Sequence, residues 1–343
     1  MAQDNPLVLY LDMNVWIQLT KGRLGKSEDW LQRFRRLFEA TRCGSIKIPL
    51  SSAHYLELWN RGNELSRTNV AETMKILSDY STIKAIHQIQ ALEVRSAVNQ
   101  RLTGIAVPLS AGQVLGRGVN HAFGSTDGRL RLVNNLQADS EPVPASEAPE
   151  EWRKLPRMGL AWEWLHLAGV QSLLDSAGID RTPEHRIGEQ FARDEEELRA
   201  CWNRNPDQWK YRADIIVGQE FLRILDDINA VAQQLRIDPH KLFFTSGSAA
   251  ERRKDIRDFL KSVPTAWTFA TLRDWKHRDK NLAWGQHDRT DLIGMSCAVP
   301  YCDVVVTEKL WSHLVTASKL SENFATKVYS LTNMDDALSG MRI

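Results

Sequence analysis

The stretch VLYLDMNVWIQL, Val8 to Leu19, decides the fold more than any other part of the chain. Its first four residues, Val8 to Leu11, form an unbroken apolar run of β-branched, aliphatic and aromatic side chains. Such a run is typical of a strand in a parallel sheet that helices cover on both faces. Asp12 follows this run directly, and a helix is expected to begin near Val15. We therefore expect a buried strand with a carboxylate at its carboxyl end.

The next segments continue the alternation of helix and strand. Apolar residues at three-and-four spacing predict an amphipathic helix over 28–42, which Gly44 ends. Residues 46–50 are predicted to form a second strand, and Ser51-Ser52 then supplies a start signal for a further helix that carries Glu57. The order strand, helix, helix, strand, helix predicts an α/β layer.

The same pattern returns only near the other end of the chain. Two helices and two strands are predicted there, over residues 288–298, 304–306, 308–318 and 327–331. We therefore expect one central parallel sheet flanked by helices, in a discontinuous core of residues 1–69 and 282–343. Residues 70–281 are predicted to be a mainly helical insertion between the second and third acidic motifs, with an exposed, Pro-rich loop near 138–150.

Composition limits the classes of function. Lys and Arg exceed Asp and Glu by 44 − 43, a formal net charge of +1 over 343 residues, so no whole-molecule field attracts a polyanion. The four cysteines have neither zinc-ligand spacing nor the density of a disulfide framework, which favours reduced thiols. No apolar run approaches the roughly 18 residues that a membrane span needs. We expect a cytoplasmic protein with no membrane segment.

Acidic side chains are predicted at the carboxyl edge of the sheet. Asp12 ends the first strand, and Glu57 lies on the helix after the second. Asp291 lies near the start of a later helix, with Asp288 three residues earlier on the same face. Because ligands collect beyond the carboxyl ends of parallel strands, we expect these carboxylates to share a crevice. The alternative is that they are separate helix caps and surface ion-pair partners.

Three segments at these positions resemble the motifs of the PIN-domain nucleases. The resemblance lies in Asp12-Met13-Asn14 after the first strand, in SSAHYLELW with Glu57, and in DLIGMSCAVPYCDVVVTEK, which begins at Asp291. It covers both flanks of the chain but not the helical middle. The resemblance implies a PIN-like core and a metal-dependent endonuclease.

The resemblance also implies roles for individual residues. Asp12, Glu57 and Asp291 would bind Mg²⁺ or Mn²⁺, and Asn14 would hold Asp12 or a water on the metal in place. Carboxylate oxygens are the ligands that such hard cations prefer. His54, one turn before Glu57, is a further auxiliary candidate.

The fourth acid of the motif is where this chain departs from the pattern. The usual Asp would fall at Lys309, and this chain instead offers Glu308 next to it and Asp303 at the entrance of the strand. Either could belong to the catalytic set. We favour Glu308 as a metal ligand because it leaves the sheet at the correct edge.

Two segments before the third motif are locally basic, RRKDIRDFLK over 252–261 and RDWKHRDK over 273–280. A surface of cations with an aromatic side chain suits phosphate contacts and base stacking, whereas a solvated helix face is the plainer alternative. The candidate nucleic-acid contacts are Arg273, Trp275, Lys276, Arg278 and Lys309.

Two functions follow from these observations. The first is Mg²⁺- or Mn²⁺-dependent endonucleolytic hydrolysis of RNA, with DNA as the alternative substrate. The resemblance to the PIN-domain family implies that such an enzyme could be toxin-like or part of phage defence. The second is a nucleic-acid-binding or scaffold protein on a catalytically degenerate core, which Lys309 in the usual acid position suggests. The insertion could serve as a substrate lid or as a partner surface. An inhibitory protein partner and a homodimer are compatible with either function.

Overall fold

The computed structural model describes residues 6–128, 150, 158–169, 182–243 and 247–341 of the chain. All but the last residue of the loop predicted near 138–150 therefore lies outside the described part.

A four-stranded parallel sheet unites the two ends of the chain. Its strands are β1 (Leu7–Leu11), β2 (Ile46–Lys47), β5 (Val304–Thr307) and β6 (Lys327–Ser330), in the spatial order β2-β1-β5-β6. In β1, Leu9 and Leu11 pack into one hydrophobic core, while Val8 and Tyr10 pack into a second core on the other face. This double burial explains the unbroken apolar run, and it confirms the prediction of a parallel sheet flanked by helices.

Helices flank the sheet on both faces, and α1 and α3 begin just beyond the carboxyl ends of β1 and β2. The helices nearest the sheet are α1 (Met13–Arg23), α2 (Glu28–Arg42), α3 (Ser52–Trp59), α18 (Asp288–Tyr301), α19 (Lys309–Ala317), α20 (Leu320–Asn323) and α21 (Met334–Gly340), with a 3-10 turn, η2 (Leu331–Asn333), after β6. The register pairs Leu11 with Val306, and the Asp12 N–H donates to the Val306 carbonyl over 2.9 Å. The carboxyl ends of β1 and β5 are therefore side by side.

The second predicted strand is shorter than expected, because β2 ends at Lys47, and the chain after it pairs with a separate two-stranded sheet. Leu50 forms a parallel bridge with Thr82 in β3 (Ser81–Ile83), which pairs antiparallel with β4 (Leu115–Arg117). The intervening helix, α4 (Glu64–Ser78), packs its apolar face into the same core as α1 and β1. The boundary expected after residue 69 thus falls inside a helix that packs on the core.

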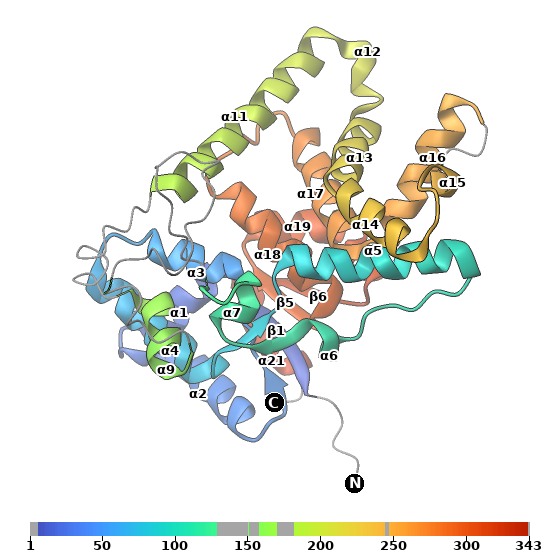
Figure 1. The fold of residues 1–343 in the computed structure, drawn as a ribbon. Coiled ribbons are helices and arrows are strands. Elements are labelled where there is room, and N and C mark those ends of the chain that lie inside the picture. The colour runs from blue at the N-terminus through green and yellow to red at the C-terminus, as the bar shows by residue number, and fades with distance from the viewer. Residues whose placement is uncertain (1–5, 129–149, 151–157, 170–181, 244–246, 342–343) are drawn as a thin grey trace.

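The rest of the middle of the chain is helical. Its helices are α5 (Ile86–Thr103), α6 (Ala111–Val114), α7 (Val119–Phe123), α9 (Leu160–Ala168), α11 (Thr182–Arg204), α12 (Pro206–Trp209), α13 (Arg212–Arg223), α14 (Leu225–Leu235), α15 (His240–Phe243), α16 (Ala249–Lys261) and α17 (Pro264–Arg278). Several of them share a third hydrophobic core that includes Trp202, Phe221 and Phe259. Figure 1 shows α11, α12, α13 and α16 projecting away from the sheet, while α17 runs back toward α18.

Two features bear on the environment of the protein. All four cysteines are free thiols, as the sequence predicts. Within the described part of the chain, no helix is both long and apolar enough to cross a membrane.

Candidate metal centre

Three carboxylates from distant parts of the chain meet at the carboxyl edge of the sheet. Asp12 follows β1, Glu57 lies on α3, and Asp291 lies in the first turn of α18. Each contributes one oxygen to a group whose members all lie within 4.8 Å of one another. We call these three residues the acidic cluster. The structure therefore brings together three of the four acidic residues that were predicted to bind the metal.

Asp12 is held from both sides. It is the N-cap of α1, where its Oδ1 accepts a hydrogen bond from the Met13 N–H over 2.6 Å. Its Oδ2 accepts one from the Thr307 hydroxyl over 2.6 Å, because the β1–β5 register sets the end of β5 beside it. Capping and cluster membership are thus combined in one residue, and its carboxylate orientation is fixed.

Asp291 is supported by a residue that sequence reasoning missed. The indole Nε1–H of Trp311, on α19, donates to Asp291 Oδ2 over 3.0 Å. Trp311 is buried in the core between the sheet and its helices, so in the sequence it is indistinguishable from an ordinary apolar position. The contact of Thr307 with Asp12 was easier to predict from the sequence. Thr307 ends one strand and Asp12 follows a neighbouring strand, and the ends of paired parallel strands lie side by side.

The charges of the cluster oppose one another. Burial, together with the negative charges of Asp291 and Asp12, raises the pKa of Glu57 well above its ordinary value. Burial and the charge of Asp12 likewise raise the pKa of Asp291, although the hydrogen bond from Trp311 acts in the other direction. Protons or a cation relieve such repulsion. Three carboxylates that repel one another and offer hard oxygen donors fit a divalent cation such as Mg²⁺ or Mn²⁺.

Glu308 lies beside the cluster and not within its 4.8 Å group. It is exposed, caps α19, and accepts a hydrogen bond from the Asn14 side-chain amide. Partial desolvation of its carboxyl, and after it the charge of Asp12, raise the pKa of Glu308. The Asn14 amide therefore contacts Glu308 and not Asp12, while its expected contact with a water on the metal stays a prediction. Glu308 remains the nearest candidate for a fourth ligand.

Asp303 does not belong to the site. Its Oδ2 accepts a hydrogen bond from the Val8 N–H over 2.7 Å, and its own N–H donates to the Val8 carbonyl. Both contacts lie where β1 and β5 begin, at the sheet edge opposite the acidic cluster. The candidate role of Asp303 in catalysis was wrong, because the strand is only as long as VVVT and Asp303 precedes it.

Lys276 and Asp288 form a buried ion pair next to the cluster. Lys276 Nζ lies 2.5 Å from Asp288 Oδ1, and it also lies 4.7 Å from the ring centre of Trp284 and 5.4 Å from that of Trp311. Lys276 is only 2 % exposed, so its expected role as a nucleic-acid contact was wrong. Its ammonium group is surrounded by protein groups and is directed to Asp288.

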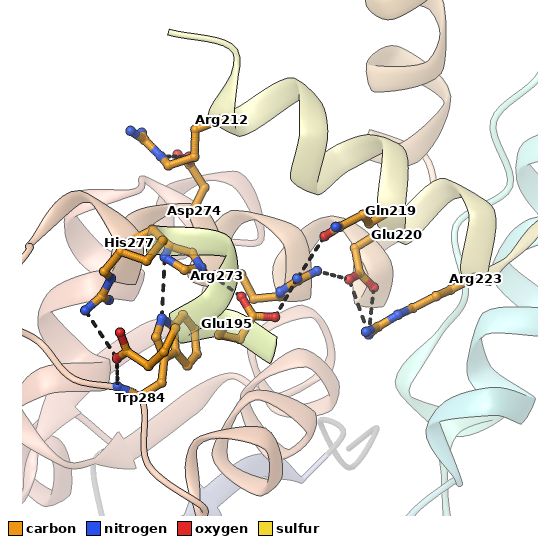
Figure 2. A network of polar contacts seen from close by, with 11 residues as sticks. Glu195, Arg212, Gln219, Glu220, Arg223, Arg273, Asp274, His277 and Trp284 are labelled. Carbon is orange, nitrogen blue, oxygen red and sulfur yellow. Dashed lines mark hydrogen bonds and ion pairs between the residues drawn. The ribbon is translucent and has the colours of Figure 1, made fainter. Parts of the chain in front are cut away.

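Arg273 is also buried, at 2 % exposure, and is likewise unavailable to a ligand. Its guanidinium donates to Glu195 over 2.6 Å and to Glu220, while His277 Nε2 lies 2.7 Å from the second Glu195 oxygen (Figure 2). We call this set the buried ion network. It joins α11, α13 and α17, and a buried charge needs such partners. The basic segment was misread because its partners come from distant sequence.

The other candidate nucleic-acid contacts remain accessible. Arg278 is exposed and lies 4.0 Å over the ring of Trp275, which is itself half-buried. Lys309 is exposed at the first position of α19, next to Glu308.

His54 has a structural role in placing Glu57. Its Nδ1 accepts from the Ser51 N–H over 2.8 Å, so Nε2 carries the proton and donates to the Leu11 carbonyl over 2.7 Å. Burial lowers the pKa of His54 to about 4, so the ring is neutral near pH 7. It ties the start of α3 to the end of β1 and thereby sets Glu57 against Asp12.

Three carboxylate oxygens that suit a divalent cation thus lie together at the carboxyl ends of the strands, on the residue that follows β1 and on α3 and α18. Comparisons of the chain with protein-family models, with curated proteins and with solved structures found no match.

Proposed function

We propose that the protein is a divalent-metal-dependent endonuclease that hydrolyses phosphodiester bonds, with RNA as its substrate class. One observation carries the proposal: three carboxylates, from residues 12, 57 and 291, converge within 4.8 Å at the carboxyl edge of a parallel sheet. Sets of carboxylates in such a crevice serve to hold Mg²⁺ or Mn²⁺. The PIN-like resemblance of the three segments supports the same function.

The residues of this chain have separable tasks in that reaction. Asp12, Glu57 and Asp291 would hold the metal, which when bound activates water and neutralises charge developing on the phosphate. Trp311 and Thr307 fix two of these carboxylates through the hydrogen bonds described above. Because those donors come from buried, packed side chains, the ligand oxygens are placed before metal or substrate arrives.

Exposed cations support contact with a polyanion, and one of them, Lys309, lies beside Glu308. Lys309 follows Glu308 directly, and Arg278 with Trp275 offers a cation stacked on an aromatic ring. Such pairs can contact backbone phosphates and stack bases of single strands.

The test is cleavage of labelled RNA by purified protein with Mn²⁺, compared among substituted proteins. Asp12→Asn and Asp291→Asn keep side-chain size but remove a metal-binding charge, and we expect each to lower the cleavage rate by more than about 100-fold. Asp303→Asn is the matched control, because it removes the same charge at the opposite sheet edge. Cleavage at the wild-type rate by both cluster variants would refute the proposal.

A scaffold function is the second candidate, and the observation that favours it is Lys309 exposed beside Glu308 where a fourth acid is expected. A cation there could replace a metal in neutralising phosphate. Calorimetric titration separates the two functions. Binding of Mn²⁺ at millimolar or lower concentration supports the nuclease, and its absence supports the scaffold.

A further inference from the structure

The two basic segments that the sequence singles out, 252–261 and 273–280, meet at one place in the insertion. Arg253 lies in the first segment, on α16, and Lys280 ends the second segment, just after α17. Both side chains lie over aromatic rings of a third segment, residues 209–211, which runs from the end of α12 to the start of α13. The fold therefore collects cations and aromatic rings from three separate parts of the chain.

Tyr211 is the exposed aromatic ring of this place. It is 44 % exposed and belongs to none of the three hydrophobic cores, so packing of the fold does not explain it. Lys210 Nζ lies 5.1 Å from the centre of its ring, and Arg253 Cζ lies 5.6 Å from the same centre. Both cationic side chains are exposed, so they can turn from the ring to a phosphate. An accessible ring between cations suits a base and its backbone.

The segment that carries Tyr211 is anchored on both sides of this residue. Before it, the Trp209 ring packs edge to face on Trp202 of the third core, with ring centres 6.0 Å apart. After it, the Arg212 Nε–H donates to Asp274 over 2.7 Å (Figure 2), and Arg212 Cζ lies 4.6 Å from the centre of the Trp209 ring. The position of Tyr211 is thus set before a ligand arrives, which lowers the entropy that binding costs.

The charge of this place is locally positive. Two aspartates are each shared by two arginines: Asp274 pairs with Arg212 and Arg278, and Asp214 pairs with Arg253 and Arg257. Lys210 and Lys280 are exposed, and neither forms an ion pair with any residue that the structure describes. When Asp207 and Asp279, their neighbours in sequence, are counted, these six cations stand against four acids. An excess of cations attracts a polyanion at short range.

We call Trp209, Lys210, Tyr211, Arg253 and Lys280 the cation–aromatic surface, and we propose that it binds a single strand of nucleic acid. A base stacks on Tyr211, and the cations contact the backbone phosphates. A single strand fits better than an acidic peptide of glutamates, which has charge but no flat ring to stack. Figure 1 shows α12 at the end of the insertion away from the sheet, so this surface is separate from the acidic cluster. The inference concerns binding and does not rest on cleavage.

Binding without cleavage tests the stacked base. The probe is a fluorescein-labelled uridine decamer, and its affinity for the full-length protein is measured by fluorescence anisotropy in EDTA. Tyr211→Ala removes the ring and should weaken binding by about fivefold or more, whereas Tyr211→Phe keeps the ring and should bind within about twofold of wild type. Leu222→Ala is the matched control, because Leu222 is an exposed apolar residue on the same helix, α13, and should leave affinity unchanged.

The dependence of binding on salt tests the phosphate contacts. Between about 50 and about 200 mM salt, each contact contributes about 0.7 to the slope of log affinity against log salt for single strands, so Lys280→Ala should reduce that slope by about 0.7. Lys26→Ala, at an exposed position between α1 and α2, removes the same charge and should leave the slope unchanged. If Tyr211→Ala lowers the melting temperature, the slope decides. The proposal is refuted if folded Tyr211→Ala matches Leu222→Ala in affinity, or if Lys280→Ala matches Lys26→Ala in slope.

Two further ligands test the class of partner. A deoxyuridine decamer should bind within about threefold of the uridine decamer, because the contacts reach bases and phosphates that RNA and DNA share; a preference of about tenfold or more for either sugar would contradict them. A peptide of ten glutamates should compete only at much higher concentration, and equal competition would make this a surface for acidic proteins and refute the assignment. Since no step requires metal or cleavage, a failure of the nuclease proposal would leave this result intact. An active nuclease whose binding is unaffected by Tyr211→Ala would refute only the surface.

Discussion

Glu57→Gln is expected to have opposite effects on stability without and with a divalent metal. The folded state raises the pKa of Glu57 well above its ordinary value of 4.5, through burial first and then through Asp291 and Asp12. Such a group binds more protons in the folded state than in the unfolded state. The proton bound to Glu57 therefore stabilises the folded state fully at low pH. This stabilisation is lost as pH rises from 4.5 through the pKa of the folded state. The metal-free wild type should lose stability over that window.

The distance within the cluster gives the magnitude. Two unit charges 4.8 Å apart repel by about 3.5 kcal/mol at an effective dielectric constant of about 20. Glutamine keeps the size of the side chain and removes its charge. Since solvent and partial protonation weaken the repulsion, we expect the variant to gain about 1 to 3 kcal/mol over wild type in EDTA near pH 8.5. With Mn²⁺ at about 1,000 times its dissociation constant, wild type should gain about 4.1 kcal/mol and the variant little.

The assay is urea or thermal unfolding followed by tryptophan fluorescence, at about pH 5 and about pH 8.5, with EDTA or with Mn²⁺. The order of stability of the two proteins should reverse between EDTA and Mn²⁺ at the higher pH. Glu322→Gln, at an exposed position on α20, is the control and should respond to neither condition. The reasoning is refuted if the Glu57 variant is less stable than wild type in EDTA, or if Mn²⁺ stabilises both proteins equally.

Three further substitutions test other parts of the account. Trp311→Phe removes the hydrogen-bond donor to Asp291 and should weaken Mn²⁺ binding about tenfold in a calorimetric titration. Trp284→Phe, at another buried position, is the control and should leave Mn²⁺ binding unchanged. Equal losses of Mn²⁺ affinity in both variants would contradict the positioning role of Trp311. Arg273→Met leaves buried carboxylates without their cation and should cost about 3 to 5 kcal/mol in urea unfolding, against about 0.5 kcal/mol or less for exposed Arg278→Ala. Burial raises the pKa of Glu93 from 4.5 to about 7. The proton on Glu93 therefore stabilises the folded state, and this stabilisation is lost as pH rises through that range. The stability of Glu93→Gln relative to wild type should therefore rise by about 3 kcal/mol between about pH 4.5 and about pH 8, and a constant difference would count against the assignment.

The sheet and the acidic cluster could be predicted because their signals are local. The apolar run before Asp12 is long enough to be buried on both faces, and the strand appears as Leu7–Leu11. The helix predicted over 28–42 appears as Glu28–Arg42, since its apolar spacing fits one face. In a parallel sheet the carboxyl ends of neighbouring strands lie together, so the end of each predicted strand shows which carboxylates are close in space.

Features that depend on distant partners could not be predicted. Arg273 and Lys276 read as a basic surface, yet they lie on the inward face of α17, where Glu195 and Asp288 arrive from other helices. Nothing in their own neighbourhood separates them from Arg278, which is exposed.

Short elements were the other difficulty. The second strand is only Ile46–Lys47, and a single bridge between Leu50 and Thr82 links the chain after it to the separate sheet of β3 and β4. A three-residue strand such as β3 has too few side chains to show a period of two. The core boundary was therefore placed inside α4, although the apolar side chains of this helix pack in the core beside the sheet.

A crystal soaked in Mn²⁺ tests the central claim most directly, because anomalous scattering locates the ion without reference to activity. We expect a Mn²⁺ peak within about 2.5 Å of carboxylate oxygens of Asp12, Glu57 and Asp291. Absence of a peak at this cluster at millimolar Mn²⁺, or a peak bound only by other residues, would contradict it.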